Sequence, residues 1–194
     1  MRTIRTKLYK FDELVVDAQQ NAIEDYRENQ YVDLDMFNES VKEQIEEAGF
    51  YEDVKLQYSL SYCQGDGLSF ECNRIKESVL LSFFAEILGK NKEKTAKIIM
   101  KYCTFECTGN KGSHYCYASK GDISYEFDDY SGNKNLIHEI VSKVEDKVKE
   151  LYLNLCKEFE NQGYKELEYL RSDENIREIL LENEYEFLKS GKRY

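Results

Sequence analysis

The most regular alternation of apolar and polar side chains in the chain covers residues 53–72. In the first half of this segment apolar side chains occupy every second position, at Val54, Leu56, Tyr58, Leu60 and Tyr62. A period of two is typical of a half-buried strand. The alternation resumes after Gln64-Gly65-Asp66-Gly67, where Asp-Gly favours a tight turn because Gly adopts positive φ without steric cost. The pattern predicts a β-hairpin over residues 53–72.

Apolar side chains spaced by three or four residues predict three helices in the first ninety residues. These helices cover residues 12–29, 33–48 and 78–88. Asp12 is the predicted N-cap of the first helix, because a short acidic side chain can accept a hydrogen bond from the first turn. Gly49 follows the second helix, at the position where a left-handed C-cap is expected, and Gly89 is expected to end the third.

A longer apolar seam predicts one helix from about residue 133 to residue 162. Its members keep a spacing of three or four residues: Leu136, Ile140, Val144, Val148, Leu151, Leu155 and Phe159. Gly163 is expected to end this helix, since Gly is a poor helix former. Two shorter helices are expected after it, over residues 165–170 and 174–181, and the helical C-terminal part therefore covers residues 133–182.

Further strands complete the predicted fold. They cover residues 3–10, 97–108, 113–119 and 122–128. The last three are expected to form a three-stranded meander over residues 97–128. No internal repeat or linker divides the sequence. We therefore expect a single α+β domain over residues 1–194, in which an antiparallel sheet of the N-terminal strand, the hairpin and the meander packs with several helices.

Acidic residues concentrate in residues 11–50. Twelve carboxylates there face only Arg27 and Lys42, which leaves a net charge of −10 in a chain whose whole formal charge is −11. The carboxylates either keep a helix face solvated or mimic a nucleic-acid backbone toward a basic partner. In the second case Glu43, Glu46 and Glu47 are expected partner contacts. A field of this sign repels nucleic acid, so no direct nucleic-acid binding is expected.

Four residues have the spacing of a metal site: Cys103, Cys107, His114 and Cys116. If residues 109–112 close a hairpin, all four share one face of the sheet. Cys103 and Cys107 would then be about 13 Å apart, too far for one ion with bonds of about 2.0–2.3 Å. Only Cys107, His114 and Cys116 could converge. We expect buried reduced thiols, no metal and no cofactor.

Motifs for common enzyme classes are missing from the sequence. His138-Glu139 lacks the second histidine of a zinc protease, and no Gly-x-Ser-x-Gly elbow occurs. Gly109-Asn110-Lys111-Gly112-Ser113 superficially resembles a phosphate-binding loop, but no helix is expected to follow it. No catalytic residues are assigned, and a non-enzymatic protein is expected. No signal peptide and no apolar run long enough to span a bilayer is visible, so a cytoplasmic protein without membrane contact is expected.

The turn of the predicted hairpin also carries candidate contact residues. Asp66 and the two glycines are common in turns for conformational reasons alone. Turn chemistry does not require Gln64 or the flanking Tyr62 and Ser69. We therefore expect a partner-binding surface at Tyr62, Gln64, Asp66 and Ser69.

Three further stretches are Lys7 to Leu14 with the helix after it, Tyr58 to Phe70 (YSLSYCQGDGLSF), and Asn183 to Phe187. Together they resemble a family of small proteins from phages and prophages. The resemblance implies a small, soluble protein made in a bacterial host during infection or from a mobile element. It carries over no catalytic residues. Small acidic phage proteins often inhibit a host machine by binding it, and anti-CRISPR proteins are a prominent class.

Two functional hypotheses follow. In the first, the protein is a phage-derived, non-enzymatic inhibitor that binds a host defence protein, such as a nucleic-acid-binding CRISPR complex, through its acidic surface. In the second, it is a nucleotide- or signalling-molecule-binding protein or a small enzyme that acts through the hairpin region around Gln64 and Asp66.

Overall fold

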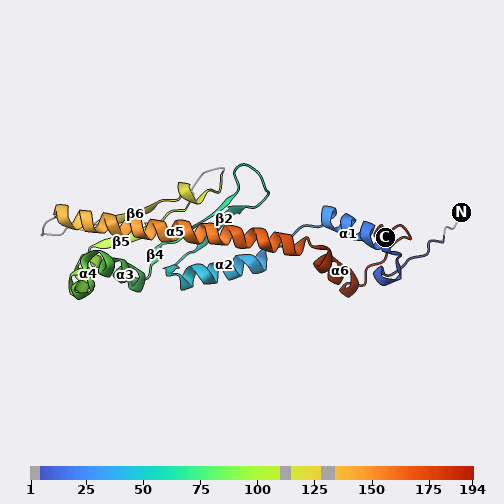
Figure 1. The fold of residues 1–194 in the computed structure, drawn as a ribbon, viewed down its shortest axis with the longest axis horizontal. Coiled ribbons are helices and arrows are strands. Elements are labelled where there is room, and N and C mark those ends of the chain that lie inside the picture. The colour runs from blue at the N-terminus through green and yellow to red at the C-terminus, as the bar shows by residue number, and fades with distance from the viewer. Residues whose placement is uncertain (1–4, 110–114, 128–133) are drawn as a thin grey trace. The chain divides into compact units, whose positions relative to one another are not determined.

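Helices make up most of the part of the chain that the structure describes, and the strands found there form three short antiparallel pairs (Figure 1). The computed structural model describes residues 5–109, 115–127 and 134–194. Internal contacts divide the chain into a first compact unit, residues 1–34 and 164–194, and a second unit, residues 35–163. The predicted α+β class is confirmed. That the chain unfolds as a single domain stays a prediction.

The first unit is built around helices α1 (Val16–Asn29) and α6 (Asp173–Glu182). A 3-10 turn, η1 (Phe11–Glu13), precedes α1, whose N-cap is Val15, so the predicted N-cap at Asp12 is wrong. The predicted strand over residues 3–10 is also wrong for its described part, because Tyr9 forms only an isolated bridge with Phe187. The unit's buried core consists of Phe11, Leu14, Ala18, Ala22, Ile23, Ile176, Leu180 and Phe187.

The strands of the second unit pair two by two. β1 (Phe50–Tyr51) pairs with β4 (Arg74–Ile75), β2 (Lys55–Ser59) with β3 (Gly67–Glu71), and β5 (Cys103–Cys107) with β6 (Ile123–Phe127). The predicted hairpin is confirmed as β2 and β3. The predicted meander is wrong, because β5 pairs directly with β6 and Phe105 lies opposite Tyr125.

Two parts of the predicted meander adopt helical structure instead. Its first residues belong to α4 (Glu93–Met100), where Ala96 and Ile99 are buried, and a spacing of three fits a helix better than a strand. Residues 118–120 form a 3-10 turn, η3 (Ala118–Lys120). Most of the turn predicted at residues 109–112 lies outside the described residues.

The remaining helices of the second unit are α2 (Asp35–Glu47), α3 (Glu77–Leu88), η2 (Lys90–Lys92) and most of α5 (Lys134–Leu170). Gly49 follows α2 with a φ of 103°, which confirms the expected left-handed position. Gly89 ends α3 as expected, with a φ of 90° and a ψ of 145°. The predicted end of the long helix at Gly163 is wrong, because α5 continues through it and includes the short helix predicted at residues 165–170.

Close packing explains why a glycine lies inside α5. A Cβ atom at Gly163 would lie 2.5 Å from Cδ1 of Leu60 and 3.0 Å from Cζ of Phe37. Gly163 therefore lets the hairpin and α2 approach the helix axis. The helix accepts the conformational cost of Gly, roughly 1 kcal/mol, because tertiary packing decides this position.

Aromatic rings fill the centre of the second unit. The Tyr152 ring of α5 lies 4.8 Å from the Phe70 ring of β3, and the Phe70 ring lies 5.2 Å from the Phe50 ring. The Tyr152 hydroxyl donates a hydrogen bond to the Phe70 carbonyl oxygen at 3.2 Å. All three side chains are almost completely buried. This cluster fixes α5 against the strands that carry the candidate sites.

Candidate contact surfaces on α2 and the hairpin loop

Helix α2 separates apolar and acidic side chains onto opposite faces. Phe37, Val41 and Ile45 are buried, and the Phe37 ring meets the Tyr58 ring edge to face at 5.9 Å. The exposed face carries an acidic stripe, which consists of Asp35, Glu39, Glu43, Glu46 and Glu47. Successive members are three or four residues apart for most of the stripe, so they line up along about 18 Å of helix.

Four of the five carboxylates of this acidic stripe lack an ionic partner among the described residues. Within the part of the chain that the structure describes, Glu39, Glu43, Glu46 and Glu47 form no ion pair. Lys42 is the one cationic residue in α2. A partner that offered cations would therefore meet carboxylates that have no internal ion pair to break.

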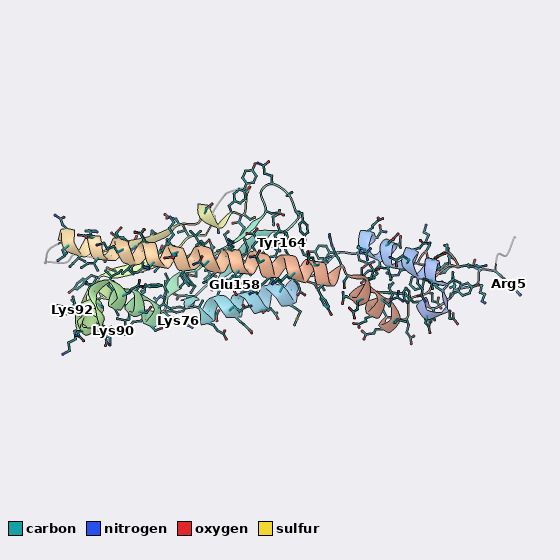
Figure 2. All side chains as sticks on the ribbon, in the orientation of Figure 1. Arg5, Lys76, Lys90, Lys92, Glu158 and Tyr164 are labelled. Carbon is teal, nitrogen blue, oxygen red and sulfur yellow. The ribbon has the colours of Figure 1, made fainter. Side chains whose placement is uncertain are left out.

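Polar contacts hold α2 in place. The Gln44 side chain exchanges amide hydrogen bonds with Gln162 of α5, at 3.3 and 3.2 Å. At the C-terminal end of α2 the ammonium group of Lys76, labelled in Figure 2, donates to the Glu46 carbonyl oxygen. A cation at this end also complements the helix dipole. The acidic stripe is therefore presented on a fixed helix, which lowers the entropy cost of binding.

The other carboxylates of the acidic segment belong to the first unit. Residues 11–34 contribute seven of them, on η1, α1 and the residues around these elements. Arg27 of α1 is paired with Asp173 of α6 in the same unit. In the sequence, residues 11–50 form one acidic region. In the structure, these residues belong to two units. The acidic stripe of α2 is the part that lies on a single helix.

The turn of the hairpin is longer than the sequence predicts. Ser59 pairs with Gly67, so residues 60–66 form a seven-residue loop between β2 and β3. The Asp66 carboxylate organises this loop from inside. Its Oδ2 accepts from the backbone N–H groups of Ser61 at 2.7 Å and Cys63 at 3.1 Å. Its Oδ1 accepts from the Ser59 hydroxyl at 2.8 Å and the Cys63 thiol at 3.2 Å.

Two predicted contact residues are therefore interior residues. Asp66 is 9% exposed and its carboxylate oxygens serve the loop, and Ser69 in the middle of β3 is completely buried. Neither side chain can meet a partner directly, which corrects their place in the predicted surface. Tyr62 and Gln64 are exposed, as are Glu43, Glu46 and Glu47 on α2.

The two glycines of the turn leave space for another segment of the chain. The backbone N–H of Cys116 donates to the Gly65 carbonyl oxygen at 3.1 Å. A Cβ at Gly65 would lie 2.5 Å from the Tyr115 ring, and a Cβ at Gly67 would lie 2.7 Å from the Cys116 carbonyl oxygen. Residues 115–117 therefore cross the loop instead of forming the predicted strand. The close approach, and not a ligand, accounts for these glycines.

This crossing adds aromatic side chains that sequence reasoning missed. The Tyr115 and Tyr117 rings stack at 5.7 Å with an interplanar angle of 13°. Tyr115 is 41% exposed, and Tyr62 on the loop is 65% exposed with a positive φ of 56°. Tyrosine is enriched at protein interfaces, and strained backbone is concentrated at functional sites. The sequence pattern that could have predicted this aromatic pair is the spacing of two between Tyr115 and Tyr117, on either side of Cys116.

The residues with metal-site spacing lie in different surroundings. Cys107 is buried and pairs with Cys72 through two backbone hydrogen bonds of 3.0 and 3.2 Å, while Cys116 contacts Gly65. Cys103 is four residues before Cys107 on β5 and lies opposite Phe127 of β6. His114 lies outside the described residues. Among the residues that are described, no group of three or more metal-ligating side chains occurs.

Replacing Asp66 with Asn should make the Cys63 thiol more reactive. The hydrogen bond to Asp66, burial and the negative charge of Asp66 raise the pKa of Cys63 above its ordinary value. Asn keeps the size of the side chain but removes the charge, so the thiolate is favoured at a lower pH. The rate of alkylation of Cys63 by iodoacetamide, measured against pH by mass spectrometry, should have its midpoint at lower pH in Asp66→Asn.

Cys103, which lies outside this loop, is the internal reference for that experiment. Its alkylation profile should be the same in both proteins. An unchanged midpoint for Cys63 would show that Asp66 does not control the thiol.

Comparison with protein-family models, curated proteins and solved structures finds no match. Of the helices within residues 5–109, 115–127 and 134–194, none has the length and apolar character needed to cross a membrane.

Proposed function

We propose that the protein is a non-enzymatic inhibitor that binds a basic, nucleic-acid-handling protein of a bacterial host through the acidic stripe of α2. The observation that supports this most directly is the row of exposed carboxylates on one fixed helix, of which Glu39, Glu43, Glu46 and Glu47 form no ion pair with any residue that the structure describes. Such a row presents negative charge at regular intervals, as a nucleic-acid backbone does. A groove of Lys and Arg built for nucleic acid would attract it, and nucleic acid itself would be repelled.

The phage setting of the proposal rests on the resemblance of the YSLSYCQGDGLSF segment and its flanking stretches. In that setting the partner is a host defence complex such as a CRISPR nuclease. Pull-down from the lysate of a defended bacterial host, followed by mass spectrometry, would identify the partner. Expression of the protein should then raise the plating efficiency of a phage on that host. Recovery of no nucleic-acid-handling protein, together with unchanged plating, would refute the proposal.

Charge reversal on the acidic stripe should weaken partner binding. In Glu43→Lys/Glu46→Lys/Glu47→Lys three carboxylates become cations, and we expect the dissociation constant to rise at least tenfold. Binding of the variant should also depend less on salt, because fewer screened charge contacts remain. Calorimetric titrations with the purified partner at several salt concentrations would measure both effects.

The matched control lies on α1. Asp17→Lys/Glu24→Lys/Glu28→Lys changes the net charge by the same amount at exposed positions of the first unit. It should retain most of the affinity. Equal losses in the two variants would mean that net charge, and not the acidic stripe, drives the association.

The second hypothesis, a ligand site at the hairpin turn, receives less support from the geometry. The Asp66 carboxylate is occupied within its own loop, and residues 115–117 cover Gly65 and Gly67. The exposed Tyr62 and Tyr115 fit a protein contact better than a phosphate cradle. Adding nucleotides to the protein should therefore leave the rate at which Cys63 is alkylated unchanged.

A further inference from the structure

A cavity of about 510 Å³ opens between α3, α4, β4 and β5 in the second unit. Its volume lies within the range of about 300–1,000 Å³ that is usual for small-molecule sites. The lining residues come from elements far apart in the sequence, and all of them are described. The cavity is separate from the acidic stripe of α2 and from the hairpin loop.

The charge of this cavity opposes the charge of the chain. Arg74, Lys97 and Lys101 line it with a single carboxylate, Glu77, although the protein as a whole carries −11. Lys90, Lys92 and Lys94 lie on η2 and the start of α4, and Figure 2 labels the first two beside the helix pair. Clustered cations beside a low-dielectric wall concentrate anions from solution.

A ligand could replace the ion pairs already present at a small cost in free energy. Arg74 pairs with Glu52 at 2.7 Å, and Lys97 pairs with Glu93 at 2.8 Å, but all four side chains are about half exposed or more. Exposed pairs of this kind contribute about 0–1 kcal/mol. Lys101 forms no ion pair with any residue that the structure describes. The guanidinium and the two ammonium groups can therefore turn to an anion at small cost.

The wall behind the cations is apolar. Ile75, Leu80 and Phe105 are buried there, and Tyr51 and Met100 are partly exposed beside them. A cavity with a cationic rim and an apolar wall fits a ligand with an anionic group and a flat, weakly polar body. Arg and Lys bind phosphate well, and a nucleobase stacks on an aromatic ring. Inorganic phosphate alone would leave the apolar wall uncovered.

We infer that this cavity binds a mononucleotide, with its phosphate at Arg74, Lys97 and Lys101 and its base against Tyr51 and the apolar wall. The inference does not rest on the proposed inhibitor function, because it concerns other residues and another class of ligand. It gives the protein a second binding activity, through which a nucleotide of the host could be sensed or sequestered.

The test is calorimetric titration of the whole protein at low salt with AMP, GMP, CMP and UMP, and separately with inorganic phosphate. At least one mononucleotide should bind saturably and at least tenfold more tightly than phosphate. Lys97→Ala/Lys101→Ala should weaken that binding at least tenfold. Lys90→Ala/Lys92→Ala removes the same charge nearby but outside the lining, and should change the binding less than threefold. All four lysines are exposed, so both variants should fold.

Cys103 supplies an independent measurement, since it lines the same cavity and is partly exposed. The bound nucleotide should slow its alkylation by iodoacetamide, while the rate at Cys63 on the hairpin loop stays the same. The inference is refuted if no mononucleotide binds saturably, if phosphate binds as tightly as the nucleotides, or if the two lysine variants lose affinity equally. Charge reversal on α2 should leave nucleotide binding intact, which separates this result from that of the proposed function.

Discussion

Truncation of Tyr152 to Ala should lower the free energy of unfolding by about 4 kcal/mol. The side chain is completely buried and contacts the Phe70 and Phe50 rings. Ala would leave a cavity in the centre of the second unit and would remove the hydroxyl donor of the Phe70 carbonyl oxygen. Urea unfolding followed by circular dichroism would measure the loss as a lower midpoint with an unchanged slope.

The conservative variant Tyr152→Phe separates packing from hydrogen bonding. It keeps the ring and removes only the hydroxyl, and the Phe70 oxygen still accepts from the Cys107 thiol at 3.3 Å. We expect a loss of about 1 kcal/mol. If Phe were as damaging as Ala, the hydroxyl and not the ring would be the main stabilising group at this position.

Gly191→Ala should be almost as destabilising, by about 3 kcal/mol, through the first unit. Gly191 has a φ of +89°, which disfavours any residue with a Cβ atom. That Cβ would also overlap the carbonyl oxygen of Ala18. Ala18 lies in the first turn of α1, and its backbone oxygen cannot move aside as the end of a flexible side chain could, so the C-terminal turn must leave the unit's core.

Gly89→Ala is the matched control, because Gly89 has nearly the same φ, +90°, and nothing within 4 Å of its added Cβ. It should cost about 1 kcal/mol, from the backbone conformation alone. Equal effects of the two substitutions would show that the contact with Ala18 does not matter.

These variants also test the single-domain prediction. If the chain unfolds as one domain, Tyr152→Ala and Gly191→Ala lower the same transition, and hydrogen exchange speeds up in both units in either variant. Faster exchange in Gly191→Ala that is confined to residues 5–34 and 164–194 would contradict the prediction and make the two units separate domains.

Local patterns in the sequence were sufficient for most elements of the fold. The hairpin, the three amphipathic helices α1, α2 and α3, the positive φ of Gly49 and the end of α3 at Gly89 each follow from periodicity or from backbone sterics over a few residues. Their exposed side chains, including those of the acidic stripe, follow from the same periodicity.

What could not be predicted depends on contacts between distant residues. Glycine occurs at position 163 inside the helix because the side chains of Leu60 and Phe37 fill the space of a Cβ atom, and no local rule includes these distant residues. Asp66 is a common turn residue, but its role in organising a seven-residue loop depends on the path of Ser59, Ser61 and Cys63. The cationic cavity was missed for the same reason. Arg74 and Lys97 are 23 positions apart, and only the packing of α4 and β4 against β5 places them on one cavity.

The assembly of the first unit from both ends of the described chain has a consequence for protein synthesis. Residues 5–34 are made before residues 35–163, but α6 and Phe187, which cover their apolar side chains, are made only after that segment. At about 5–20 residues per second, this delay lasts on the order of ten seconds. During this delay, Ala22 and Ile23 of α1 are without the residues that bury them in the folded unit. The N-terminal segment is therefore where a nascent chain would recruit chaperones, while residues 35–163 can already fold.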